Sequence, residues 1–122
     1  MHDPGRSVLI VDDEADVRES LAAVLETEGY RVVEAENGET ALRRLAGSAD
    51  VSLILLDLSM PVMNGWTFRE EQLRDPRLAA IPVVVITADT GAARRAQALG
   101  VVDALTKPLE FDRLLALVAR YC

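Results

Sequence analysis

The sequence has one cysteine, few aromatic residues and no long apolar run. Cys122 has no second cysteine with which to form an internal disulfide. The longest aliphatic runs, residues 53–56 and 83–86, are far shorter than the roughly 18 residues that a membrane span requires. Residues 1–6 contain no apolar secretory segment. We therefore expect a cytoplasmic protein that is not embedded in a membrane.

Basic residues are outnumbered by acidic ones. The chain has 13 Lys and Arg residues against 20 Asp and Glu residues, which gives a formal net charge of −7. This charge opposes binding to a nucleic-acid backbone or to an anionic membrane surface, so we expect no direct nucleic-acid partner. The length of 122 residues is typical of one domain, and we take residues 1–122 as that domain.

Short segments rich in aliphatic and β-branched residues alternate with segments of helical spacing five times along the chain. The pattern predicts strands at residues 8–11, 31–34, 53–57, 82–86 and 101–106. The first, third and fourth of these are apolar without alternation, which is typical of parallel strands covered on both faces. The sequence therefore predicts an α/β fold with a doubly wound parallel sheet and these three strands at its centre.

The intervening segments predict five helices, which differ in how much apolar surface they offer for packing against the sheet. In the first predicted helix, Asp16 and Glu19 fit a capping box. Gly29 and Gly47 stand where the first and second helices end, at positions that favour a positive φ. Asn37 is the expected cap of the second helix. The third helix, 65–74, has a weak apolar stripe. The fourth, 91–99, is built on alanines and should hold loosely to the sheet, whereas the last has an apolar arc wide enough to face a partner as well.

Polar residues follow four of the predicted strands directly. They are Asp12 and Asp13, Asp57, Thr87 and Lys107, after strands one, three, four and five. Ligands of open parallel sheets bind outside the carboxyl ends of the strands. We therefore expect three carboxylates, one hydroxyl and one ammonium group to meet at one edge of the sheet.

A cluster of three carboxylates favours a bound cation and phosphoryl chemistry. The carboxylates repel one another, and a hard divalent ion with oxygen ligands, Mg²⁺ above all, removes that conflict. Asp57 directly follows four aliphatic residues, and its carboxylate is the candidate nucleophile for attack on phosphorus. Thr87 and Lys107 are the candidate ligands of the phosphoryl oxygens. His2 and Cys122 are expected to have no chemical role.

These residues resemble those of the receiver domain of two-component response regulators, over essentially the whole chain. The matching stretches are residues 8–14, 55–61 with Asn64 and Gly65, 86–88 and 105–108. The resemblance implies a flavodoxin-like five-stranded sheet in the order 2-1-3-4-5. It also implies that a sensor histidine kinase or a histidine phosphotransfer protein is the phosphoryl donor, and that the domain signals by conformational change rather than as a turnover enzyme.

The resemblance also assigns roles to individual residues. It implies that Asp57 is the phosphoacceptor and that Mg²⁺ is bound by Asp13, Asp57 and the main-chain carbonyl of Ser59, with Asp12 acting through water. Thr87 and Lys107 then bind the phosphoryl group. The resemblance further implies a cis peptide bond between Lys107 and Pro108. Lys107 is the single lysine among the 13 basic residues, at a position that requires a compact ammonium group.

One residue departs from the family pattern. Three residues before the lysine, receivers usually carry Tyr or Phe, whose ring turns inward when the switch threonine moves, and this chain has Ala104. The usual aromatic readout cannot operate with a methyl group. We therefore expect phosphorylation to be read out by movement of the loop after Thr87 and of the fourth helix.

Three other functions are alternatives. A flavodoxin-like FMN protein is disfavoured because the acidic loop after the first strand repels phosphate. A haloacid-dehalogenase-like phosphatase normally has a second aspartate two residues after its nucleophile, where this chain has Ser59, and its acidic pair comes late in the chain. A degenerate receiver that acts only as a docking module is favoured by Ala104 and opposed by the complete acidic site. Since no output domain follows Cys122, we expect a stand-alone receiver or a piece of a longer protein, as a monomer or weak dimer.

Overall fold

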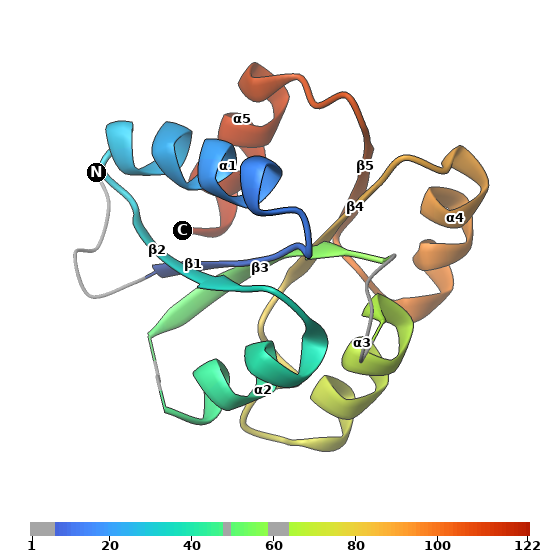
Figure 1. The fold of residues 1–122 in the computed structure, drawn as a ribbon. Coiled ribbons are helices and arrows are strands. Elements are labelled where there is room, and N and C mark those ends of the chain that lie inside the picture. Colours follow the sequence, from blue (N-terminus) through green and yellow to red (C-terminus); the bar gives the residue numbers. More distant parts are fainter. Residues whose placement is uncertain (1–6, 48–49, 59–63) are drawn as a thin grey trace.

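The computed structural model describes residues 7–47, 50–58 and 64–122. Strands and helices alternate along the chain, as the hydrophobic pattern predicts (Figure 1). The elements are β1 (Ser7–Val11), α1 (Ala15–Thr27), β2 (Arg31–Ala35), α2 (Gly38–Ala46), β3 (Val51–Asp57), α3 (Gly65–Arg74), β4 (Val83–Thr87), α4 (Thr90–Arg95), the 3₁₀ helix η1 (Ala96–Leu99), β5 (Asp103–Thr106) and α5 (Phe111–Tyr121).

The strands form one parallel five-stranded sheet in the order β2-β1-β3-β4-β5. This confirms the predicted fold class and strand order. The three strands predicted to be central, β1, β3 and β4, occupy the middle of the sheet, and their residues are buried almost throughout. The fourth strand begins at Val83 rather than at residue 82, and the fifth at Asp103 rather than at residue 101.

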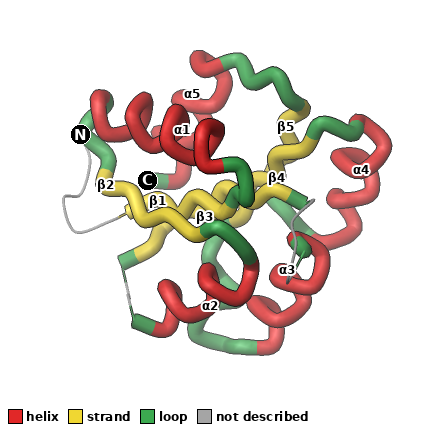
Figure 2. The backbone as a smooth tube through the Cα atoms, in the orientation of Figure 1, coloured by secondary structure: helices red, strands yellow, loops and turns green. Residues whose placement is uncertain are grey.

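Helices cover both faces of the sheet, so that the protein has three layers (Figure 2). On one face, α1 and α5 pack through residues such as Leu21, Leu25 and Leu114 against one set of strand side chains. On the other face, α2, α3 and α4 pack against the alternate set, with Phe68 of α3 fully buried. Because successive strand side chains point to opposite faces and both faces are covered, the middle of each central strand must be apolar at every position, as residues 8–11, 53–56 and 83–86 are.

Two predictions about helix ends are wrong. Asp16 and Glu19 do not form a capping box, because α1 begins at Ala15 with Glu14 as its N-cap and has no side-chain cap. Gly29 has the expected positive φ of 92°, but Gly47 has a φ of −95°, which any residue adopts. The prediction for Asn37 is confirmed, since its side chain accepts a hydrogen bond from the main-chain N–H of Thr40.

The last two helices differ in detail from the sequence pattern. The fourth helical segment starts at Thr90 and tightens into the 3₁₀ helix η1 at Ala96, with Ala92 and Ala96 as its buried residues. In α5, Leu114 and Val118 are buried, whereas the Phe111 side chain remains 46% exposed. In the described part of the chain, no helix has the length and apolarity needed to cross a membrane.

Candidate functional site

The strand register brings the predicted site residues to the carboxyl edge of the sheet. The last residue of β1, Val11, pairs with Leu56 of β3, so Asp12 follows β1 beside the point where Asp57 ends β3. Asp57 in turn pairs with Ile86, which places Thr87 at the end of the neighbouring strand β4. The common edge is thus a direct consequence of parallel strands that end at the same level.

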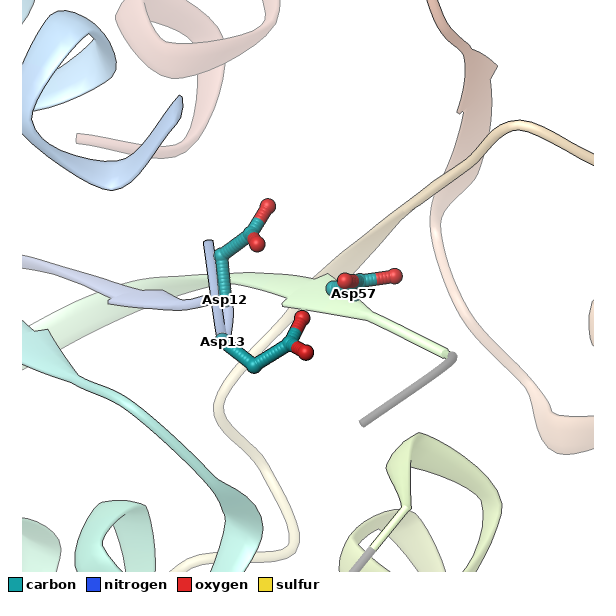
Figure 3. A group of neighbouring side chains, drawn as sticks. All are labelled: Asp12, Asp13 and Asp57. Atoms are coloured by element: carbon teal, nitrogen blue, oxygen red, sulfur yellow. The ribbon is translucent and has the colours of Figure 1, made fainter. Parts of the chain in front are cut away.

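Three carboxylates converge at this edge (Figure 3). One oxygen from each of Asp12, Asp13 and Asp57 lies within 4.8 Å of the others. Asp12 and Asp57 are buried, with exposures of 2% and 5%, whereas Asp13 is exposed. Two buried carboxylates and a solvent-facing one provide hard oxygen donors with an open side toward water, which fits the preferences of Mg²⁺.

Lys107 is the cation beside this cluster. Its Nζ lies 3.3 Å from Asp12 Oδ2, 3.5 Å from Glu14 Oε1 and 3.9 Å from Asp57 Oδ2. Burial lowers the pKa of Lys107, but the carboxylates of Asp57, Asp12 and Glu14 raise it by more, so its pKa lies above the ordinary value. Lys107 is therefore protonated at neutral pH, and one ammonium group faces several carboxylates.

Main-chain contacts fix the segment that carries the lysine. The main-chain N–H of Lys107 donates a 2.8 Å hydrogen bond to the carbonyl of Thr87, which ties the end of β5 to the end of β4. The Lys107–Pro108 peptide bond is cis, as predicted.

Thr87 is buried at the end of β4, with an exposure of 4%. Its hydroxyl accepts a hydrogen bond from the main-chain N–H of Asp89, and Asp89 caps the start of α4. A pocket of about 290 Å³ opens beside it, lined among others by Leu58 and Trp66. Thr87 thus lines a pocket together with Leu58, the residue that follows Asp57. Its hydroxyl is also linked through Asp89 to the first turn of α4.

Arg18 also belongs to this site, although it was not predicted from the sequence. Its guanidinium donates a 2.7 Å hydrogen bond to the main-chain carbonyl of Asp12 and a 3.1 Å hydrogen bond to Glu34 Oε1 of β2. The signal was present, because Arg18 lies three and seven residues before the buried Leu21 and Leu25, on the apolar stripe of α1. A charged residue on a buried stripe requires partners, and here they are the main-chain carbonyl of Asp12 and the carboxylate of Glu34.

We expect an Arg18→Lys variant to bind Mg²⁺ more weakly, by a factor of about 3 to 10, and to be destabilised by about 1–2 kcal/mol. Lysine keeps the positive charge, but one ammonium group cannot span both acceptors as the guanidinium fork does. Calorimetric Mg²⁺ titration and urea unfolding measure the two effects. Arg94→Lys, an exposed position on α4, is the control. Equal Mg²⁺ affinity in both variants would show that Arg18 does not position Asp12.

Three of the four residues predicted as metal ligands therefore lie together, and the fourth lies outside the described residues. Asp12, Asp13 and Asp57 form a cluster with the chemistry of an Mg²⁺ site. Ser59, the fourth predicted ligand, lies outside the described residues. His2 lies outside them too. Cys122 lies beside Ser52 near the start of β3, with 3.0 Å between Sγ and Oγ, whereas Asp57 ends that strand.

Comparisons with known proteins agree with this architecture. Residues 8–119 match the family of response regulator receiver domains. The chain is 37% identical over 114 residues to the phosphate regulon transcriptional regulatory protein PhoB of Pseudomonas aeruginosa, covering 92% of this chain and 49% of PhoB. It is 45% identical over 114 residues to the response regulator PleD of Caulobacter vibrioides, covering 91% of this chain and 25% of PleD. The chain thus spans half or less of these two relatives.

Solved structures are similar over the full fold. The response regulator TrrA of Thermotoga maritima, determined in complex with Mg²⁺ and BeF, has a TM-score of 0.85 and 28% sequence identity, and the match covers 96% of this chain and 99% of TrrA. The chain belongs to the family of response regulator receiver domains, which are signalling domains of two-component systems.

Proposed function

We propose that Asp57 accepts a phosphoryl group from a phosphohistidine donor, in a reaction that requires Mg²⁺. Receiver domains of response regulators are phosphorylated by histidine kinases, and the donor for this chain is by this proposal a sensor histidine kinase or a histidine phosphotransfer protein. The observation that carries the proposal is the convergence of Asp12, Asp13 and Asp57 beside Lys107 at the edge of the sheet.

The reaction transfers the phosphoryl group from the donor histidine to the carboxylate of Asp57. A carboxylate oxygen of Asp57 attacks phosphorus and forms a new P–O bond, while the P–N bond to the donor histidine breaks and its imidazole leaves with the bonding electron pair and gains a proton. The product is an acyl phosphate. Water then attacks the phosphorus and regenerates the carboxylate and inorganic phosphate, so the phosphorylated state is temporary.

Each neighbour of Asp57 has a proposed part in this step. Lys107, fixed near the carboxylate by the main chain of Thr87, is placed to bind an oxygen of the phosphoryl group as charge spreads over it. The Thr87 hydroxyl binds another oxygen once it leaves its hydrogen bond with Asp89. Asp12, Asp13 and Asp57 would hold Mg²⁺, with Ser59 as a further proposed ligand, and the bound ion would supply positive charge to offset that of the phosphoryl oxygens.

The proposal assigns a signalling role rather than enzymatic turnover. The comparisons give no support to a haloacid-dehalogenase-like phosphatase, because the matches are to receiver domains. A docking module without chemistry would keep the same fold but would have no use for three clustered carboxylates around a lysine. We also propose that the protein is cytoplasmic and that it is a monomer or weak dimer. The receiver is proposed to make no direct contact with nucleic acid.

Intact-mass measurement tests the proposed function. We expect the protein to gain one phosphoryl group when incubated with a small acyl phosphate and Mg²⁺, and none when a chelator is present. The added mass should disappear over time after the donor is removed, because an acyl phosphate hydrolyses in water. If the mass is unchanged in saturating Mg²⁺ with the acyl phosphate and also with a phosphorylated histidine kinase, the docking-module alternative replaces this proposal.

A further inference from the structure

We propose that Arg69, a buried arginine of α3, transmits phosphorylation of Asp57 to the end of η1 and the start of β5. The inference rests on the proposed phosphorylation and adds the route by which the signal reaches the surface formed by α4, η1 and β5. Three structural links carry it: α3 to the phosphoacceptor strand, Arg69 to the end of η1, and the separate connection of α4 to Thr87.

The first link joins the start of α3 to the main chain of Asp57. Gly65, the first residue of α3, donates a 3.1 Å hydrogen bond to the carbonyl of Leu58. A Cβ atom on Gly65 would lie 2.6 Å from the carbonyl oxygen of Asp57 and 2.7 Å from Cα of Leu58. Helix and strand are in direct main-chain contact, so a shift of the strand end displaces the first turn of α3.

The second link joins α3 to the end of η1. Arg69 lies one turn beyond Gly65 and is only 5% exposed. Its Nε donates a 3.0 Å hydrogen bond to the carbonyl of Leu99, and its Nη2 a 3.2 Å hydrogen bond to the carbonyl of Gly100. Gly100 has a positive φ of 72° and lies three residues before the first residue of β5, Asp103. The guanidinium therefore holds the point where η1 ends and the chain turns toward β5.

The acceptors of Arg69 in the described residues are neutral oxygens, and none is a carboxylate. The carbonyls at the end of a helical segment carry partial negative charge, which offsets part of the cost of burying a guanidinium. Burial lowers the pKa of Arg69, but arginine remains protonated in proteins. A buried charge held by two carbonyls of one segment makes α3 and the end of η1 move together, because separation would remove both carbonyl acceptors from a buried charge.

Gln72 fixes the orientation of the guanidinium. Its Oε1 accepts a 2.8 Å hydrogen bond from Nη1 of Arg69, and its side-chain amide donates to the carbonyls of Leu78 and Ile81 before β4. Gln72 is fully buried. The network leaves Arg69 one geometry, which is what a rigid connection between two helices requires.

The other end of the α4–η1 segment is connected to the site independently. Thr87 is linked through Asp89 to the first turn of α4. Ala104 of β5 is half-buried against the core, and its methyl group has no rotamer to change. The segment thus has two connections to the site, Thr87 at its start and Arg69 at its end. With both intact, phosphorylation changes the environment of the whole segment rather than its first turn alone.

Hydrogen exchange with a phosphoryl mimic tests this route. The probe is beryllofluoride with Mg²⁺, and exchange is followed in residues 88–95 and 96–103 of the wild type, Arg69→Met and Arg69→Lys. We expect a severalfold change in exchange rate in both segments of the wild type. In Arg69→Met the change should persist in 88–95 and disappear in 96–103. Arg74→Met, an exposed arginine on the same helix, is the control and should behave as the wild type.

The outcomes separate this inference from the proposed function. If beryllofluoride with Mg²⁺ does not raise the thermal stability of the wild type, the proposed chemistry of Asp57 is wrong. If it binds and residues 96–103 respond equally in Arg69→Met, or do not respond in the wild type, the Arg69 route is wrong. Should Arg69→Met fail to fold, Arg69→Lys decides, since its single ammonium group keeps the charge but cannot hold both carbonyls in the same geometry.

Discussion

An Asp57→Asn variant is expected to accept no phosphoryl group and to be more stable than the wild type in Mg²⁺-free buffer. The amide has no anionic oxygen to attack phosphorus, so uptake should fall below detection. The gain in stability has a separate cause. Each of the charges around Asp57 lies within 4.8 Å of its carboxylate. At an effective dielectric constant of about 20, two charges at such a distance interact by roughly 3–4 kcal/mol. Among the interactions of Asp57 with these three neighbours, the substitution removes two repulsions, with Asp12 and Asp13, and one attraction, with Lys107.

Exposure of Asp13 to solvent screens one of those repulsions, so the expected net gain is about 1–2 kcal/mol. Calorimetric unfolding with and without Mg²⁺ measures it. Saturating Mg²⁺ should stabilise the wild type by about 2–3 kcal/mol at a hundredfold excess over its dissociation constant, and the variant much less. Asp112→Asn, which removes a carboxylate on α5, is the matched control and should give no gain. A variant that is less stable than the wild type without Mg²⁺ would mean that the carboxylates do not repel one another as described.

The sheet could be predicted from the sequence because its signal is redundant. The segments at 53–56 and 83–86 are apolar at every position, and such short runs with helical segments on either side are typical of strands covered on both faces. The location of the site follows from the same logic, since Asp57 comes directly after such a strand. The roles of these residues still depend on the family resemblance, which covers the residues but not the contacts that position them.

Buried polar residues on the helices were not predicted, for a physical reason. Arg69 and Gln72 occupy the buried face of α3, and the sequence pattern counts them only as a weakening of the apolar stripe. Their partners are main-chain carbonyls at Leu99, Gly100 and the loop before β4, and every residue has a carbonyl. Recognition of such a network requires the fold, because nothing in the side-chain sequence marks the acceptors.

The helix ends show the same limit on a smaller scale. Asp16 has the residue type of a cap, but the N-cap of α1 is Glu14, two residues earlier, whose main-chain N–H donates a hydrogen bond to Asp12 Oδ1. Gly47 has the residue type of a left-handed helix end, yet its φ is −95°. In both cases the residue type shows only that a residue is able to cap or end a helix. The geometry of the neighbouring strand end or loop decides whether it does.

Gly65→Ala is expected to cost stability and Mg²⁺ affinity together. The added Cβ would lie 2.6 Å from the carbonyl oxygen of Asp57 and 2.7 Å from Cα of Leu58, and both are main-chain atoms that cannot rotate away. Relief therefore requires the end of β3 and the start of α3 to separate, which moves the Asp57 carboxylate from its neighbours. Overpacking of this kind costs about 1–3 kcal/mol. We expect at least that loss in urea unfolding, and a weaker calorimetric Mg²⁺ affinity by about tenfold, equivalent to about 1.4 kcal/mol.

Gly47→Ala provides the matched control for this substitution. Within the described residues, a Cβ at Gly47 would meet no atom closer than 3.8 Å, and its φ of −95° suits alanine. Where the native conformation suits alanine, replacing glycine stabilises a protein by about 0.4–1 kcal/mol through the unfolded chain. We thus expect opposite signs from two chemically identical substitutions, and an unchanged Mg²⁺ affinity in Gly47→Ala. If both variants are as stable as the wild type and bind Mg²⁺ equally well, contact between α3 and β3 does not position Asp57, and the first link of the Arg69 route fails with it.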